Sequence, residues 1–185
     1  MSLPLETRIA KTKSLYNAIP TILWSLMGFT PIGYFCYVYM ELMWIYLFLA
    51  LSLTILFLPD SFFQIIRMSA NVSFYQKIGI RIVKKLTQDG DLVNRNLQRK
   101  FSNQRRLLSQ NEIKRQISRS YFNEKMHFAM FTFFLLTAGY AFFHNFLMWA
   151  LVISLTNIVF NIYPIFLQQY NRLRIRHIVK RQRPS

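Results

Sequence analysis

Two long apolar blocks without a lysine or an arginine divide this chain, and they constrain its fold more than any other feature. The blocks cover residues 21–58 and 128–167, and the one Asp, Glu, Lys or Arg in them is Glu41. A bilayer core is ~30 Å thick, and a helix needs ~20 apolar residues to cross it. Each block is therefore long enough for two crossings. A break at Glu41 and another at residues 143–145 divide each block into a helical hairpin.

We therefore predict an all-α integral membrane protein with four transmembrane helices, arranged as two hairpins, in a single membrane domain that covers residues 1–185. A basic middle segment, about residues 59–124, is cytoplasmic or interfacial, and a basic tail follows at residues 168–185. Apolar and basic side chains alternate irregularly over residues 59–88, which fits either a segment in the headgroup layer or a packed soluble layer. The predicted spans cover about residues 21–40, 42–58, 125–143 and 146–167.

The basic residues predict the orientation. All 23 Lys and Arg lie outside the two blocks, and the net charge is +16. Positively charged segments stay cytoplasmic, so both termini and the middle segment should be inside, with the hairpin tips at Glu41 and His144 outside. Basic residues at the inner surface attract anionic headgroups, which makes membrane lipids expected partners. The chain has no nucleic-acid motif, so we expect no nucleic acid partner.

A long helix is predicted to enter the third span from the middle segment. Ser109 and Glu112 form a capping box, and an apolar stripe that includes Ile113 and Tyr121 follows at a spacing of four residues. Nothing in the sequence interrupts this helix before the span. His127 should then lie about one turn inside the membrane boundary.

Glu124 and His127 share one face of this helix and are candidates for chemistry, because ionisable groups at membrane depth are expensive. Three interpretations compete. Glu124 could orient His127 as a general base on a hydroxyl. The pair could instead supply two metal ligands, but the chain offers few others, and we predict no metal site. In the third interpretation, Glu124 forms an interfacial salt bridge with Lys125 or Arg119.

A second candidate group lies at the end of the last span. If the segment is helical, Asn161, Gln168 and Arg172 share a face. Arg172 and Arg174 suit a phosphate or carboxylate, because guanidinium binds such groups bidentately. Together with Tyr170 and Asn171, these residues form a predicted substrate-binding group. The alternative is inner-leaflet anchoring by Tyr170 and the arginines.

The last span ends in a distinctive pattern. It consists of Asn161, Pro164 and then the sequence QQYNRLR at residues 168–174. This pattern resembles the C-terminal signature of the glycosyl-4,4'-diaponeurosporenoate acyltransferase family. Residues 75–80 and the Glu124–His127 pair are similar to two further motifs of that family, so the resemblance covers roughly residues 74–174. Gln169 and Leu173 stand where the family usually has Arg and Pro.

The resemblance implies a multi-pass acyltransferase of the bacterial inner (cytoplasmic) membrane. It would move a fatty acyl chain from a thioester donor, acyl-CoA or acyl carrier protein, to a hydroxyl of a glycosylated carotenoid or another glycolipid at the inner leaflet. The thioester is a co-substrate, and no cofactor is expected. The chain has no Gly-x-Ser-x-Gly elbow. We therefore expect direct attack by the acceptor hydroxyl, with His127 taking its proton, Glu124 orienting His127, and Asn161 or Gln168 binding the acyl oxygen.

The competing class is non-enzymatic. A small membrane protein with basic cytoplasmic faces also fits a subunit or adaptor of a larger membrane complex. Either function allows an oligomer or a complex partner. An adaptor has no reason to bring Glu124, His127, Asn161 and Gln168 together, so their arrangement in space discriminates between the two classes.

Overall fold

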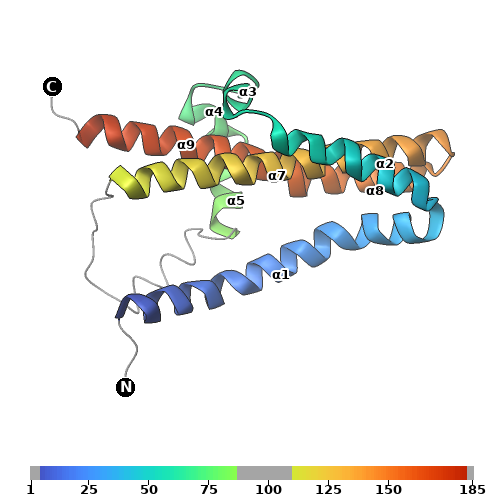
Figure 1. Ribbon diagram of the computed structural model, residues 1–185, viewed down its shortest axis with the longest axis horizontal. Coiled ribbons are helices and arrows are strands. Elements are labelled where there is room, and N and C mark those ends of the chain that lie inside the picture. Colours follow the sequence, from blue (N-terminus) through green and yellow to red (C-terminus); the bar gives the residue numbers. More distant parts are fainter. Residues whose placement is uncertain (1–4, 87–109, 183–185) are drawn as a thin grey trace.

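The computed structural model describes residues 5–86 and 110–182, and this part of the chain is helical without a strand (Figure 1). The elements, in chain order, are α1 (Leu5–Tyr39), α2 (Leu42–Leu53), the 3₁₀-helix η1 (Thr54–Phe57), α3 (Asp60–Ile65), α4 (Val72–Lys77), α5 (Ile80–Leu86), α7 (Gln110–Phe143), α8 (Leu147–Asn157), the π-helix η2 (Ile158–Ile162) and α9 (Tyr163–Gln182).

Within the described residues, three helical stretches are long and apolar enough to cross a membrane, where the sequence predicted four. They are Ile22–Tyr39, Gln110–Phe143 and Leu147–His177. The stretch Leu42–Phe57 is shorter, because α2 passes into η1 at Thr54 and the helix ends before Pro59. Its length is about 26 Å from the helical rise, which is less than the ~30 Å of a bilayer core. The all-helical prediction is confirmed for residues 5–86 and 110–182, and the fourth span remains a proposal.

Both predicted breaks are present in the structure. Glu41 has an extended backbone, with φ −72° and ψ 142°, and separates α1 from α2. The second break is a tight turn between α7 and α8, in which Asn145 takes a left-handed φ of 62°. Asn tolerates this conformation better than most residues. The Phe146 N–H closes the turn by donating to Ala141 O at 2.8 Å.

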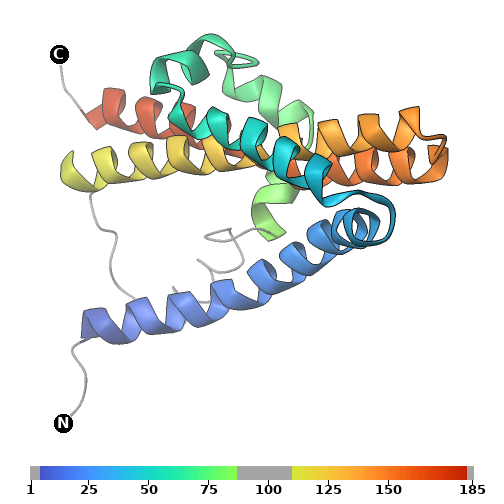
Figure 2. The ribbon, with the colours of Figure 1, turned by 45° about the vertical axis from the view of Figure 1, so that its right-hand side comes forward.

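The predicted long helix is α7, which continues without interruption from the middle segment to the turn. Ser109, the predicted cap, lies outside the described residues. Ile113 and Tyr121 of the predicted stripe are both buried. α7 runs antiparallel to α8 and α9 and packs against both, so the two long helices α7 and α9 lie side by side (Figure 1, Figure 2).

Two apolar clusters hold the elements together. Near the hairpin tips, Phe35 is fully buried, and its ring contacts those of Tyr140 and Trp149. In the other cluster, α4 and α5 pack against α9 through a set of buried side chains: Tyr75, Ile80, Leu167, Tyr170 and Leu173. At these positions, the middle segment therefore forms a packed layer on α9, one of its two predicted arrangements.

The structure makes the predicted orientation testable, because His144 is exposed at the α7–α8 turn and Lys114 is exposed at the other end of α7. In a Cys36→Ala background, which removes the buried free cysteine, we expect a membrane-impermeant maleimide to label His144→Cys from outside intact cells. Lys114→Cys should be labelled only after lysis. Labelling of Lys114→Cys in intact cells would contradict the cytoplasmic middle segment.

Candidate functional site

A buried ion pair joins α7 to α9. Glu124 of α7 has no exposed surface, and Arg172 of α9 is 4% exposed. The Arg172 Nη2 atom contacts Glu124 Oε2 directly. The other carboxylate oxygen, Oε1, accepts a hydrogen bond of 2.7 Å from Gln169 Nε2. Two buried charges are tolerated only when they are paired and hydrogen-bonded, so this contact fixes α7 against α9.

Gln169 connects the ion pair to the middle segment. Its Oε1 atom accepts hydrogen bonds from Tyr75 OH at 2.8 Å and from Met68 N at 3.2 Å. The amide orientation is unambiguous, because a backbone N–H faces the oxygen and the Glu124 carboxylate faces the nitrogen. Burial raises the pKa of the Tyr75 hydroxyl, which therefore stays protonated. The same hydroxyl accepts the Ser69 N–H at 3.1 Å. One network thus joins the middle segment, α7 and α9.

The Arg172 guanidinium has further partners inside the bundle. It lies 4.0 Å from the centroid of the Tyr121 ring, a cation–π contact. Its Nη1 atom lies 3.4 Å from Ser120 Oγ. The Ser120 hydroxyl donates in turn to Gln168 O at 3.0 Å. One turn further along α9, Arg176 Nη2 lies 3.4 Å from Tyr121 OH. The structure therefore uses Arg172 for internal contacts.

A second polar group lies one helical turn away, between α7 and η2. The half-buried His127 imidazole interacts with the Asn161 side chain and with the backbone of Phe160. Asn161 Nδ2 donates to Asn157 Oδ1 at 2.8 Å, and Asn157 Nδ2 donates to Phe131 O at 3.1 Å. Asn157 and Asn161 are both buried. The result is a row of polar side chains across an otherwise apolar part of the bundle.

Glu124 and His127 have different partners, although they are three residues apart on α7. Glu124 binds Arg172, and His127 binds Asn161. No hydrogen bond between Glu124 and His127 is present among the described contacts. In the structure, the His127 imidazole therefore interacts with Asn161 and not with Glu124, while the catalytic role predicted for the pair stays a prediction. The physical reason is that a charged guanidinium stabilises a buried carboxylate more than a neutral imidazole does, because its hydrogen bonds are charge-assisted.

The salt bridge in our third interpretation is present with a different partner. Glu124 was expected to pair with a basic neighbour, for which Lys125 and Arg119 were the examples. Lys125 instead lies 2.8 Å from Asp60 of α3, and Arg119 is exposed. The arginine that binds Glu124 comes from α9, 48 residues away. Local spacing along a helix gives no information about such a partner.

Among the described contacts, the side chains of the other predicted substrate-binding residues do not join these polar groups. Tyr170 is buried in the apolar cluster with α4 and α5. Arg174 is exposed and Asn171 is half-buried. Gln168 contributes its backbone carbonyl, while the neighbouring Gln169 occupies the position beside Glu124.

Sequence reasoning missed Gln169 because of a shift in helical register. An α-helical spacing of seven residues from Asn161 leads to Gln168. The π-helix η2 has i→i+5 hydrogen bonds and a wider turn, which displaces the residues that follow by about one position. The signal available in the sequence was a glutamine only two residues beyond the apolar block that ends at Leu167. The described residues contain no group of three or more His, Cys, Asp or Glu that could hold a metal ion.

Comparison with known proteins gives one finding. A family model described as glycosyl-4,4'-diaponeurosporenoate acyltransferase matches residues 59–181, which is more than half of the chain. No curated protein and no solved structure matches the chain.

The Gln168–Gln169 pair provides a matched test of the network. Gln169→Ala removes one hydrogen bond from the buried Glu124 carboxylate and one from the Tyr75 hydroxyl, at about 0.5–3 kcal/mol per bond, while Arg172 and Ser69 remain as their other partners. We expect a clear fall in the thermal unfolding midpoint of the protein in detergent. Gln168→Ala keeps its backbone contact and should change the midpoint little. Equal effects of the two substitutions would show that Gln169 has no special structural role.

The ion pair makes a second prediction. Glu124→Leu or Arg172→Met leaves one buried charge without its partner, and each should lower stability by about 3–5 kcal/mol. The double replacement of Glu124→Leu with Arg172→Met removes both charges and should recover most of that loss. A double-mutant cycle on the unfolding midpoints measures the coupling. Strictly additive effects would show that the two side chains do not interact.

Proposed function

The chain belongs to the glycosyl-4,4'-diaponeurosporenoate acyltransferase family, and we propose from this membership that it transfers a fatty acyl group to a hydroxyl of a glycosylated carotenoid in a membrane. One observation supports the proposal most strongly. The matched residues 59–181 include every member of both polar groups between α7 and α9. A subunit that served only as an adaptor would not require a buried row of polar side chains in its apolar part.

We assign proton transfer to His127. Asn161 Nδ2 donates to Asn157, which leaves Asn161 Oδ1 to accept an imidazole N–H. A neutral imidazole that donates this hydrogen bond keeps a lone pair on its other nitrogen, as a general base requires. The acceptor hydroxyl gives its proton to that nitrogen as its oxygen attacks the thioester carbonyl carbon. The new C–O bond forms, the C–S bond breaks, and the leaving thiolate takes the proton from the imidazolium.

Glu124 and Arg172 act as positioning residues in this proposal. Their ion pair fixes α7 against α9 one turn from His127, and thereby sets the distance between His127 and Asn161. Arg174, which is exposed on α9, remains our candidate for binding the anionic part of the donor, the phosphates of acyl-CoA or acyl carrier protein. Asn171 is half-buried beside it and could assist through a hydrogen bond.

The membrane arrangement that suits this reaction has both termini and the middle segment in the cytoplasm. The stretch Leu42–Phe57 would be the fourth crossing, and local thinning of the bilayer would accommodate its short length. His127 would then lie near the inner leaflet, where a cytoplasmic thioester and a lipid-borne hydroxyl meet. Cysteine labelling tests this arrangement in the membrane, and the ester assay tests the reaction itself.

His127→Ala should reduce acyl transfer by about 10²–10⁴-fold, the usual contribution of a general base. The measurement is ester formation by the purified protein in liposomes, from an acyl thioester and a glycosylated carotenoid, resolved by mass spectrometry. Asn161→Ala should have a smaller effect and should shift the pH profile, because the imidazole loses an oriented partner.

The control is His144→Ala, which replaces the exposed histidine at the α7–α8 turn. It should leave the rate unchanged. If His127→Ala retains the parental rate while the protein accumulates normally, His127 is not the base. If the parent protein forms no ester with any thioester tested, the proposed acyl transfer itself fails.

A further inference from the structure

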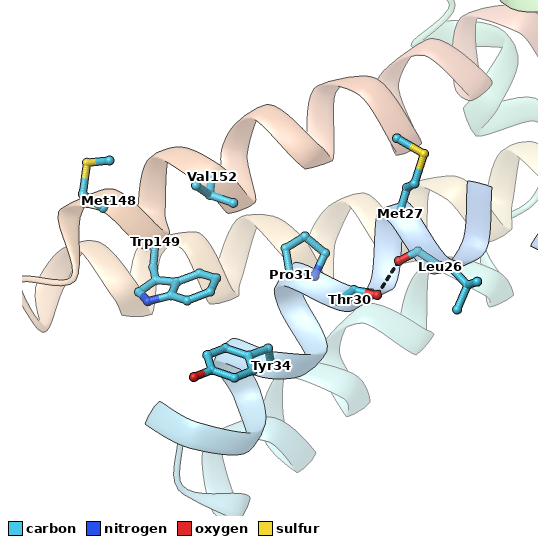
Figure 3. Close-up of a pocket in the computed structure, with 8 residues that line it drawn as sticks. All are labelled: Leu26, Met27, Thr30, Pro31, Tyr34, Met148, Trp149 and Val152. Carbon is cyan, nitrogen blue, oxygen red and sulfur yellow. Dashed lines mark hydrogen bonds between the residues drawn. The ribbon is translucent and has the colours of Figure 1, made fainter. Parts of the chain in front are cut away.

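An apolar groove lies between α1 and α8 (Figure 3). Its volume is about 880 Å³, which is within the ~300–1,000 Å³ of small-molecule sites. From Leu26 to Tyr34 of α1, the groove extends about 12 Å by the helical rise. The residues that line it are Leu26, Met27, Thr30, Pro31 and Tyr34 of α1, with Met148, Trp149 and Val152 of α8.

The lining offers an incoming molecule almost no polar group. The Thr30 hydroxyl donates a 2.6 Å hydrogen bond to Leu26 O of its own helix (Figure 3). The rings of Tyr34 and Trp149 stack on each other, with centroids 5.5 Å apart. Met27 and Met148 add flexible thioethers, which adapt to the shape of a ligand. These walls suit a flexible hydrocarbon chain without polar substituents.

Phe160 connects the groove to the candidate site. Its backbone interacts with the His127 imidazole. Its ring lies edge-on to that of Trp24 on α1, with centroids 5.1 Å apart. It also fits against Gly28, where an added Cβ would lie 3.1 Å from the Phe160 ring. Gly28 is next to Met27 in the groove wall, so one residue separates the end of the groove from His127.

We propose that this groove binds the fatty acyl chain of the donor, with the reactive carbonyl at the Phe160 end beside His127. The inference rests on the proposed acyl transfer and adds the binding site for the transferred chain. A rigid polyene would require flat faces along the groove, whereas the Tyr34 and Trp149 rings already stack on each other. The groove should therefore select donors by the length of their acyl chain, because each methylene that it buries strengthens the binding of the donor.

The test narrows the groove from each wall and compares the acyl composition of the product. Val152→Trp fills it from α8, and Leu151→Trp is its control, since Leu151 is exposed on the same helix and does not line the groove. Thr30→Trp fills it from α1, with the exposed Phe29→Trp as control. Each protein receives an equimolar mixture of saturated acyl thioesters of different lengths and one glycosylated carotenoid.

Both groove variants should shift the product toward shorter chains. Excluding two methylenes should change the ratio of shorter to longer esters by about tenfold, while both controls keep the parental ratio. An unchanged length distribution with an unchanged KM for the carotenoid in both groove variants would overturn the proposal and show that ordinary bilayer lipid fills the groove. An unchanged distribution with a raised KM for the carotenoid would overturn it in favour of the polyene. Ester formation by the parent protein verifies the acyl transfer independently of either result.

Discussion

The ion pair between Glu124 and Arg172 is the interaction on which the rest of the structure depends. Both side chains lie inside the protein, so neither charge can be solvated if the other moves away. The pair fixes the register of α7 against α9, and Gln169 extends it to Tyr75 in the middle segment. The short helices α4 and α5 can therefore pack on α9 as a defined layer. His127, one turn along α7, takes its position from this arrangement.

The π-helix η2 determines which residues of the last helical stretch face α7. A regular α-helix from Asn157 to Arg172 would present a different glutamine to Glu124. In the structure, Asn161 meets His127 before the wide turn ends, and Gln169 meets Glu124 beyond it. π-helices are rare in proteins as a whole, but those that occur are frequently found at functional sites. Here the irregularity allows one continuous stretch of helix to serve two polar partners on α7.

The sequence allowed prediction of features that depend on local patterns. The apolar blocks, the breaks at Glu41 and Asn145, and the continuous α7 follow from composition and turn chemistry. The pairing of Glu124 with Arg172 could not be predicted from local patterns, since it depends on packing between helices that are distant in sequence. The length of the second apolar helix was also missed, because the passage from α-helix to η1 at Thr54 follows no strong local signal. Resemblance to a family drew attention to Asn161 and Arg172, without showing what each contacts.

The distribution of polarity along the helical bundle matches the amphiphilic substrates that we propose. The end of the bundle with exposed Arg174 is charged, the turn with His127 and Asn161 is polar, and the groove along α1 and α8 is apolar. An acyl thioester has the same order of groups: anionic phosphates, a reactive carbonyl and a hydrocarbon chain. Phe160 lies where the last two regions meet. A donor aligned with this gradient would place its carbonyl next to the imidazole without any charged group entering the apolar part, which is the arrangement with the lowest desolvation cost.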